Sequence, residues 1–327
     1  MLSRLREKTN GFTVTPKQFN VIAITAVTLL TLIIATGAGV RLSDSGLGCE
    51  SWPTCRAGQL TVPTDLHSLV EFGNRMLSGL ITFVVLGAAI AAMRRRPRRR
   101  DLVLLAWTLP LGAFIQAALG AMSVKSDLGY GWVMAHFATS MVMTIFAILL
   151  IWRCLHEPGS RPRSADRLTV WSIRGLLVLT AAAWISGMGA TAAGPHAGGH
   201  ADQTVSPRWE PKSSGSLEWV VHRHGRVADL LGIVAVGVWI LLWRRRASRE
   251  LRINSSVFVV LVGIQGLIGS VQWNQHLPAE LVWLHVVFAT LCWVSALWFT
   301  FTAGRLEPRS EPAPVAAGYD KKPLNAS

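Results

Sequence analysis

Eight long apolar stretches constrain this chain more than any other feature of its sequence. A membrane-spanning α-helix needs roughly 20 mostly apolar residues, and each stretch comes close to that length. Only 15% of the residues are charged, against about 25% in a soluble domain. The sequence therefore predicts an all-α polytopic membrane protein with eight transmembrane helices. They cover approximately residues 19–40, 72–93, 102–123, 131–152, 171–193, 220–243, 254–272 and 280–303.

The first apolar stretch, residues 19–40, is too long for the apolar region of a signal peptide and lacks an obvious small-residue cleavage site. We therefore interpret it as a transmembrane helix. No leader of the mitochondrial type precedes it, so we expect the protein in a bacterial cell membrane.

Positive charge is distributed unevenly between the connections. If the N-terminus is cytoplasmic, 23 Lys and Arg residues outside the helices lie on the cytoplasmic side and 5 on the opposite side. The positive-inside rule then predicts cytoplasmic N- and C-termini. The net charge of +14 is thus an orientation signal, with membrane lipid rather than nucleic acid as its partner.

The sequence repeats itself at a spacing close to 150 residues. Four matches carry the repeat: Gln116 and Gly120 with Gln265 and Gly269 (offset 149), His136 with His285 (149), Gly37 and Gly39 with Gly187 and Gly189 (150), and Asn74-Arg75 with His222-Arg223 (148). Each half begins and ends on the same side of the membrane, as in parallel repeats. The pattern predicts two tandem four-helix bundles.

This repeat divides the chain into five segments. The first four-helix half covers residues 19–153, and the second covers 171–303. A cytoplasmic N-terminal segment, 1–18, and a cytoplasmic linker, 154–170, flank the first half. The proline-rich tail 304–327 is typical of a disordered segment.

Histidines recur at one depth on the predicted helices. His136 and His285 lie near the outer starts of their helices, and His222 and His224 open the helix over 220–243. Histidines from two facing helices can bind a haem iron from both sides, or they can form interhelical hydrogen bonds. His222 and His224 point about 200° apart, so only one can face the core. The neighbouring Arg223 and the repeat offset favour His222 as the partner of His285.

The first half carries Asn74 where the repeat places His222 in the second. Arg75 and Arg223 can form charge-assisted hydrogen bonds with haem propionates, or extend to the lipid headgroups. Glu71 lies three residues before Asn74, on the same helix face. Its carboxyl group can serve in proton transfer, or it can be a solvated residue of the first helical turn.

Cys49 and Cys55 lie in the first outer loop, on the oxidising side of the membrane. A disulfide between them is plausible there. Such a bond is either structural or able to exchange electrons with a thiol partner.

Four features of the chain occur together. They are Gly46-Leu47-Gly48-Cys49 followed by Trp52-Pro53 and Cys55, the segment Glu71-Phe72-Gly73-Asn74-Arg75, two Gln-x-x-x-Gly helices that each lead to a histidine-bearing helix, and His222-Arg223. In this combination the chain resembles the haem A synthase family, from about residue 19 to 303. Asn74 stands where the family's Glu-x-x-His-Arg pattern has its histidine. Asparagine is a poor iron ligand, so this departure concerns the binding of haem.

The resemblance implies a membrane oxidoreductase that converts the C8 methyl group of haem O to the formyl group of haem A by successive hydroxylation. It implies that His222 and His285 bind haem b, and that Glu71 and His136 belong to the half that receives haem O. Asn74 leaves the second ligand of that substrate haem undetermined. The implied partners are haem O synthase, the assembly of a terminal oxidase, and a thiol redox protein acting on the outer-loop cysteine pair.

Two other classes of function are compatible with parts of this pattern. A di-haem b-type electron carrier also uses paired histidines in a helical bundle, but leaves its haem unmodified. A transporter is suggested by the internal repeat. The sparsity of charged residues in the other helices argues against the transporter.

Overall fold

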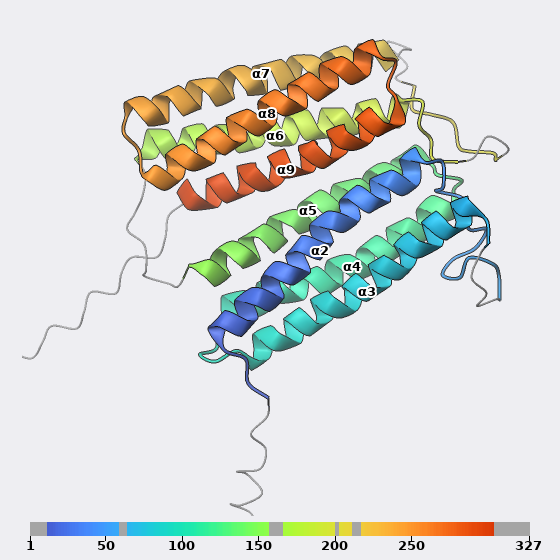
Figure 1. The fold of residues 1–327 in the computed structure, drawn as a ribbon, viewed down its shortest axis with the longest axis horizontal. Helices are drawn as coiled ribbons and strands as arrows, with labels where there is room; N and C mark the ends of the chain where they lie inside the picture. Colours follow the sequence, from blue (N-terminus) through green and yellow to red (C-terminus); the bar gives the residue numbers. More distant parts are fainter. Residues whose placement is uncertain (1–11, 59–63, 157–165, 200–202, 211–216, 304–327) are drawn as a thin grey trace, which may run out of the picture.

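Eight long helices make up the described part of the chain (Figure 1). The computed structural model describes residues 12–58, 64–156, 166–199, 203–210 and 217–303. Each helix is long and apolar enough to cross a membrane, so the predicted all-α polytopic membrane protein is confirmed. The helices are α2 (Pro16–Leu42), α3 (Leu66–Arg94), α4 (Arg100–Lys125), α5 (Tyr130–Leu155), α6 (Arg167–Ala193), α7 (Leu217–Arg244), α8 (Arg249–Asn274) and α9 (Ala279–Ala303).

Three of the predicted segments outside the helical halves are only partly described or not described. The tail 304–327, which the sequence predicts to be disordered, lies outside the described residues. Parts of the N-terminal segment 1–18 and of the linker 154–170 lie outside them as well.

Several helices begin at a side-chain cap that the sequence supplies locally. Thr15 and Gln18 form a capping box at the start of α2, in which each side chain accepts a hydrogen bond from the other residue's backbone N–H. Asp65 caps α3 and Asp166 caps α6 through their carboxylate oxygens. These caps satisfy backbone N–H groups that have no partner within the helix.

The helices form two four-helix bundles that follow one another in the sequence. Helices α2 to α5 pack around one core and α6 to α9 around another, and Figure 1 shows them as a lower and an upper group. Helix α9 packs against both α2 and α5. Its indoles Trp283 and Trp293 donate hydrogen bonds to the backbone carbonyls of Ala35 (2.9 Å) and Met141 (3.1 Å). The predicted tandem arrangement is confirmed.

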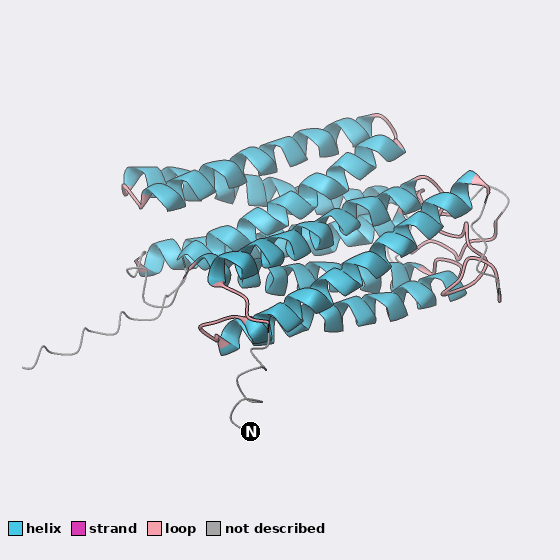
Figure 2. Ribbon diagram, turned by 60° about the horizontal axis from the view of Figure 1, so that its bottom comes forward, coloured by secondary structure: helices cyan, strands magenta, loops and turns pink. Residues whose placement is uncertain are grey.

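The long connections of both bundles lie at one end of the molecule, which we call the loop end (Figure 2). It carries the described parts of residues 43–65 and 194–216. The backbone N–H of Gly46 donates to the carbonyl of Gly198, at 2.7 Å. A loop of the second half therefore contacts a loop of the first half.

Candidate functional site

Two imidazole rings face one another in the second bundle. His224 of α7 and His285 of α9 have ring centroids 6.1 Å apart, with ring planes inclined by 80°. The Nδ1 atom of His224 lies 3.0 Å from the Oγ atom of Ser186, so one nitrogen of that ring is held by α6. The Nδ1 atom of His285 is buried and has no hydrogen-bond partner. This pair is a candidate ligand set for a metal between α7 and α9.

Two glycines make room for these rings. A Cβ atom on Gly187 would lie 3.2 Å from Cε1 of His224, and one on Gly269 would lie 3.1 Å from Cε1 of His285. Both distances are shorter than ordinary van der Waals contacts. A larger residue at either position would therefore push an imidazole away from its partner.

The first bundle repeats this arrangement around His136. Gly120 lies next to the ring, where a Cβ atom would be 3.6 Å from Cε1, and Nδ1 of His136 is buried without a partner. The amide of Gln116 donates to the backbone carbonyl of His136 at 3.0 Å, and Gln265 donates to that of His285 at the same distance. These glutamines tie each histidine-bearing helix to the helix before it.

Asn74 occupies in the first bundle the place that His224 occupies in the second. Its Oδ1 atom accepts a hydrogen bond from Thr36 Oγ1 at 2.8 Å, just as the ring of His224 pairs with Ser186. The two residues of each pair are 38 positions apart. The repeat offset here is 150, and the sequence-based pairing of Asn74 with His222 is therefore corrected.

His222 and Arg223 are exposed on the described surface of α7. The ring of His222 lies edge-on to Trp273, at 6.1 Å, and the Arg223 guanidinium carbon lies 3.8 Å from the ring centroid of Trp219. The structure does not bring His222 to His285, because His224 takes the inward position and residues two apart point about 200° apart. Arg223 stacks on an indole, as guanidinium groups often do.

Glu71 and Arg75 hold the loop that contains the cysteine pair. Glu71 is only 5% exposed, and its two carboxylate oxygens accept from the backbone N–H of Cys49 (2.8 Å) and from Arg75 (2.5 Å). Arg75 also donates to the carbonyls of Ser51 (2.6 Å) and Thr54 (3.3 Å). The guanidinium of Arg75 is thus directed at this loop, whereas the sequence offered a haem propionate or the lipid headgroups as its partner.

The predicted disulfide is present between Cys49 and Cys55. Both cysteines are buried, at 1% and 2% exposure. Glu71 and Arg75 thus attach the loop over 49–55 to the first turns of α3, at the loop end of the first bundle. The position of both cysteines in one outer loop predicted this disulfide, but the sequence did not predict the attachment of the loop to Glu71.

Sequence reasoning missed two residues of the site. Thr36 and Ser186 orient Asn74 and His224, and each directly precedes a glycine that belongs to the repeat, Gly37 or Gly187 in the respective half. The sequence did contain a signal for them. Thr36 and Ser186 both carry a hydroxyl group, and they are separated by 150 residues, as are the glycines that follow them.

A haem fits the residues present. Two metal–nitrogen bonds of about 2 Å each, together with the half-widths of two imidazole rings, give a centroid separation of roughly 6 Å, and His224 and His285 are 6.1 Å apart. Across the described residues no group of three or more His, Cys, Asp and Glu is placed to hold a bare metal ion. A haem iron brings four nitrogen ligands of its own and needs only axial ligands from the protein.

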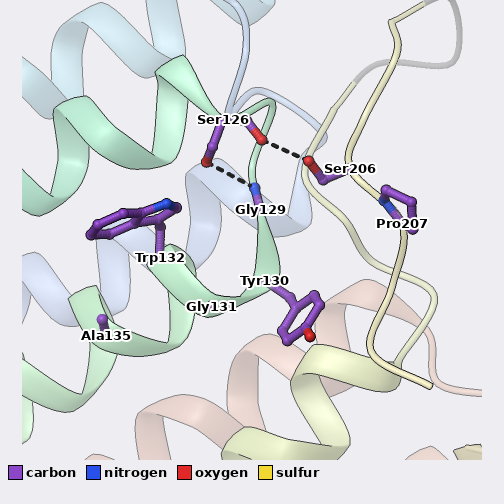
Figure 3. A pocket seen from close by; sticks show the side chains of 8 residues that line it. All are labelled: Ser126, Gly129, Tyr130, Gly131, Trp132, Ala135, Ser206 and Pro207. Atoms are coloured by element: carbon purple, nitrogen blue, oxygen red, sulfur yellow. Dashed lines mark hydrogen bonds between the residues drawn. The ribbon is translucent and has the colours of Figure 1, made fainter. Parts of the chain in front are cut away.

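A pocket of about 640 Å³ opens at the start of α5, beside the loop over 203–210 (Figure 3). Tyr130 and Trp132 line it, and Ser206 closes one side by donating to the carbonyl of Ser126 at 2.7 Å. The lining includes Ala135, the neighbour of His136, but none of the predicted site residues. The pocket shows how the loop of the second half rests on the first.

Comparison with known proteins places this architecture in a family. A protein from Lysinibacillus sphaericus named Heme A synthase is 28% identical over 149 residues, which cover 45% of this chain and 48% of that protein. Proteins of the same name from Symbiobacterium thermophilum and Exiguobacterium sp. are 33% and 29% identical, over 41% and 49% of this chain and 44% and 55% of their own lengths. The matches thus span about half the length of these relatives.

The profile of one protein family, described as cytochrome oxidase assembly protein, matches residues 20–213. This segment is more than half of the 327-residue chain. It contains all of the first bundle except the first residues of α2, and it includes the disulfide loop, Glu71 and His136. The chain belongs to the cytochrome oxidase assembly protein family.

Proposed function

We propose that this protein is a haem A synthase, an enzyme that oxidises the C8 methyl group of haem O to the formyl group of haem A by successive hydroxylation, for use in a terminal oxidase. The observation that carries the proposal is the pair of imidazoles His224 and His285, 6.1 Å apart. It occurs in a chain that belongs to the family above and resembles proteins named Heme A synthase. Paired imidazoles in a bundle are suited to hold haem iron.

The second bundle holds haem b as a resident cofactor, through His224 and His285. Ser186 fixes the ring of His224, and Gln265 fixes the helix of His285. A haem b held in this way supplies one-electron transfer. The protein's contribution to haem b binding is to orient both imidazole rings. Gly187 and Gly269 lie so close to the rings of His224 and His285 that the rings have little freedom to rotate.

The first bundle receives haem O. His136 would hold its iron, and the loop over 49–55 would form a cover that shields the site from water. Glu71 lies three residues before Asn74 on α3, which is about 4.5 Å along the helix axis. We assign Glu71 two tasks: it holds the cover through the Cys49 backbone, and its carboxylate exchanges protons at the loop end of the site.

The loop end faces the extracytoplasmic side, so both termini are cytoplasmic. The distribution of Lys and Arg supports this orientation, with anionic lipid headgroups beside the opposite end. Haem O synthase is the partner that supplies the substrate, and the assembly of a terminal oxidase consumes the product. The Cys49–Cys55 bond is the point where a thiol redox protein acts.

The test is conversion of haem O in cells that make haem O but no haem A. The full chain is expressed there, and the haems are extracted and identified by chromatography and mass spectrometry. Wild-type protein is expected to yield haem A or hydroxylated haem O, whereas His136→Ala and His224→Ala yield neither. A folded, haem-loaded wild-type protein that leaves haem O unchanged would refute the proposal, and would indicate a di-haem electron carrier instead.

A further inference from the structure

The two bundles differ at one position of an otherwise repeated site. Three pairs of residues are of the same or similar type: Thr36 and Ser186, Gly120 and Gly269, and His136 and His285. The fourth pair is Asn74 and His224, so an amide replaces an imidazole on α3. The site in the first bundle therefore lacks the ligand that the second bundle has on α7.

The hydrogen bond from Thr36 determines which end of the Asn74 amide is available. Oδ1 accepts from Thr36 Oγ1 at 2.8 Å, which leaves the NH₂ group as the free end. An amide NH₂ group donates hydrogen bonds but offers no lone pair to a metal. Asn74 is therefore oriented as a hydrogen-bond donor rather than as an iron ligand.

The shorter side chain also leaves room beside it. A Cβ atom on Gly187 would meet the ring of His224 at 3.2 Å, whereas one on Gly37, the equivalent glycine of the first bundle, would meet nothing within 4 Å. The volume that the imidazole of His224 fills in the second bundle is thus not filled by a protein side chain next to Asn74.

Three other potential ligands on α3 are held elsewhere or face away. The Nδ1 atom of His67 lies 3.0 Å from Ser45 Oγ, and seven residues separate it from Asn74, about 10 Å along the helix. Both carboxylate oxygens of Glu71 are occupied by Cys49 and Arg75. Met76 is 54% exposed and points to the outer surface of the bundle.

We infer that the haem bound in the first bundle is held by His136 alone and keeps an open axial position beside Asn74, which accepts a diatomic ligand such as carbon monoxide or cyanide. The Asn74 amide donates a hydrogen bond to that ligand. The inference rests on the proposed function, because that function places a haem in the first bundle. The second haem, between His224 and His285, has both axial positions filled and does not bind such ligands.

The test uses the purified full-length protein, with carbon monoxide added to the reduced form and cyanide to the oxidised form. Absorption spectra are expected to show that one of two haems binds carbon monoxide, and that His136→Ala loses this haem. Asn74→His supplies a second imidazole and should weaken carbon monoxide binding at least tenfold. Met76→His adds the same side chain on the exposed face of α3 and should leave binding unchanged.

Asn74→Ala provides a second test that needs no new ligand in the site. It keeps the open position but removes the donor, so cyanide should bind about tenfold more weakly, which corresponds to the loss of one hydrogen bond to a charged group. Unchanged cyanide affinity in this variant would contradict the role of the amide.

Two results would overturn the open position itself. One is a wild-type protein whose His136-dependent haem binds no carbon monoxide. The other is Asn74→His binding carbon monoxide as tightly as wild type. Neither result affects the proposed function. A protein that still holds only one haem after haem O is added, with that haem unaffected by His136→Ala, would instead refute the proposed function and this inference with it.

Discussion

At the scale of single residues, the site depends on small side chains as much as on histidines. Gly187 and Gly269 each lie against an imidazole ring, closely enough that a single added carbon would touch it. Gly120 is in ordinary contact distance of His136. The tightness of the second bundle suits a resident cofactor with two fixed ligands, and the looser first bundle suits a group that enters and leaves.

This difference predicts unequal effects of the same substitution in the two bundles. Gly269→Ala places a Cβ atom 3.1 Å from His285, and overpacking of this kind costs about 1–3 kcal/mol. The second-bundle haem should then bind roughly tenfold more weakly, as measured by haem titration of the stripped protein. Gly120→Ala should have little effect on haem binding in the first bundle, because its Cβ atom would lie at an ordinary contact distance from His136.

Gly266→Ala is the matched control for Gly269→Ala, because it lies on the same helix and its added Cβ atom would meet nothing within 4 Å. Equal loss of haem in Gly266→Ala and Gly269→Ala would contradict this account. It would show that any glycine-to-alanine change in α8 weakens haem binding, whether or not the new side chain contacts His285.

The ion pair of Glu71 and Arg75 predicts a second residue-scale effect. Their side chains are 7% and 13% exposed, so Arg75→Ala leaves a buried carboxylate without its counter-charge. We expect the free energy of unfolding to fall by about 3 kcal/mol, measured by denaturation in detergent. Arg75→Lys should recover part of this loss, because it keeps the charge but cannot also reach both loop carbonyls.

The double variant Glu71→Gln with Arg75→Gln separates pairing from packing. If the pair matters as described, the double variant is more stable than Arg75→Ala, since no unpaired charge remains. A double variant as unstable as the single one would assign the effect to the loop carbonyls of Ser51 and Thr54 instead.

At the scale of helices, the sequence was sufficient for the eight spans and for the repeat, but not for the register of every helix pair. The offset of 149 residues was correct for α5 and α9, because each helix carries a histidine, His136 or His285, that marks the equivalent position. For α3 and α7, the dipeptides Asn74-Arg75 and His222-Arg223 suggested an offset of 148 residues. The hydrogen bonds of Thr36 and Ser186 give 150, and contacts between different helices of this kind are not visible in one helix's sequence.

The same limit explains the destination of Arg75. Its position beside Asn74 suggested a haem propionate or a lipid headgroup as its partner. Instead it donates to the carbonyls of Ser51 and Thr54, which the disulfide loop brings to it. Sequence spacing predicts which residues share a helix face. It does not predict the path of a loop that returns over that face.

The start of α6 provides a pH-dependent prediction. The backbone N–H of Thr169, and then Arg245, hold the pKa of the Asp166 carboxyl below its usual value. A carboxyl with a lowered pKa stabilises the folded state above the pKa of the unfolded chain, and this stabilisation is lost as pH falls through the folded-state pKa. Asp166→Ala should therefore lower the midpoint of thermal unfolding at pH 7 and have no effect at the acid end.

The comparison is made on wild type and Asp166→Ala in detergent, from pH 7 downward. Asp166→Asn is the control that keeps a capping oxygen and removes the charge, so its deficit at pH 7 should be smaller. A difference between wild type and Asp166→Ala that grows toward low pH would contradict this account of the cap.

At the scale of the whole molecule, the two bundles are joined at several levels. Helix α9 packs on α2 and α5, the indoles of Trp283 and Trp293 cross the boundary, and a loop of the second half contacts a loop of the first. The two candidate haem sites lie at the same end of this joined structure.

The orientation of the molecule gives a prediction at the same scale. Reporter fusions should place the C-terminus in the cytoplasm and the loop over 49–55 outside, because Lys and Arg are concentrated at the other end. A fluorescent protein after Ser327 is expected to be fluorescent, and alkaline phosphatase at the same position inactive. The reverse pattern would require the disulfide loop to lie in the reducing cytoplasm, against the bond between Cys49 and Cys55.

The most direct test of the central claim is the absorption spectrum and haem content of two α7 variants purified from the same membranes. His224→Ala is predicted to lose the low-spin spectrum of the haem in the second bundle, whereas His222→Ala, two residues away and exposed, keeps it at the wild-type level. Loss of that spectrum in His222→Ala together with its retention in His224→Ala would contradict the site described above.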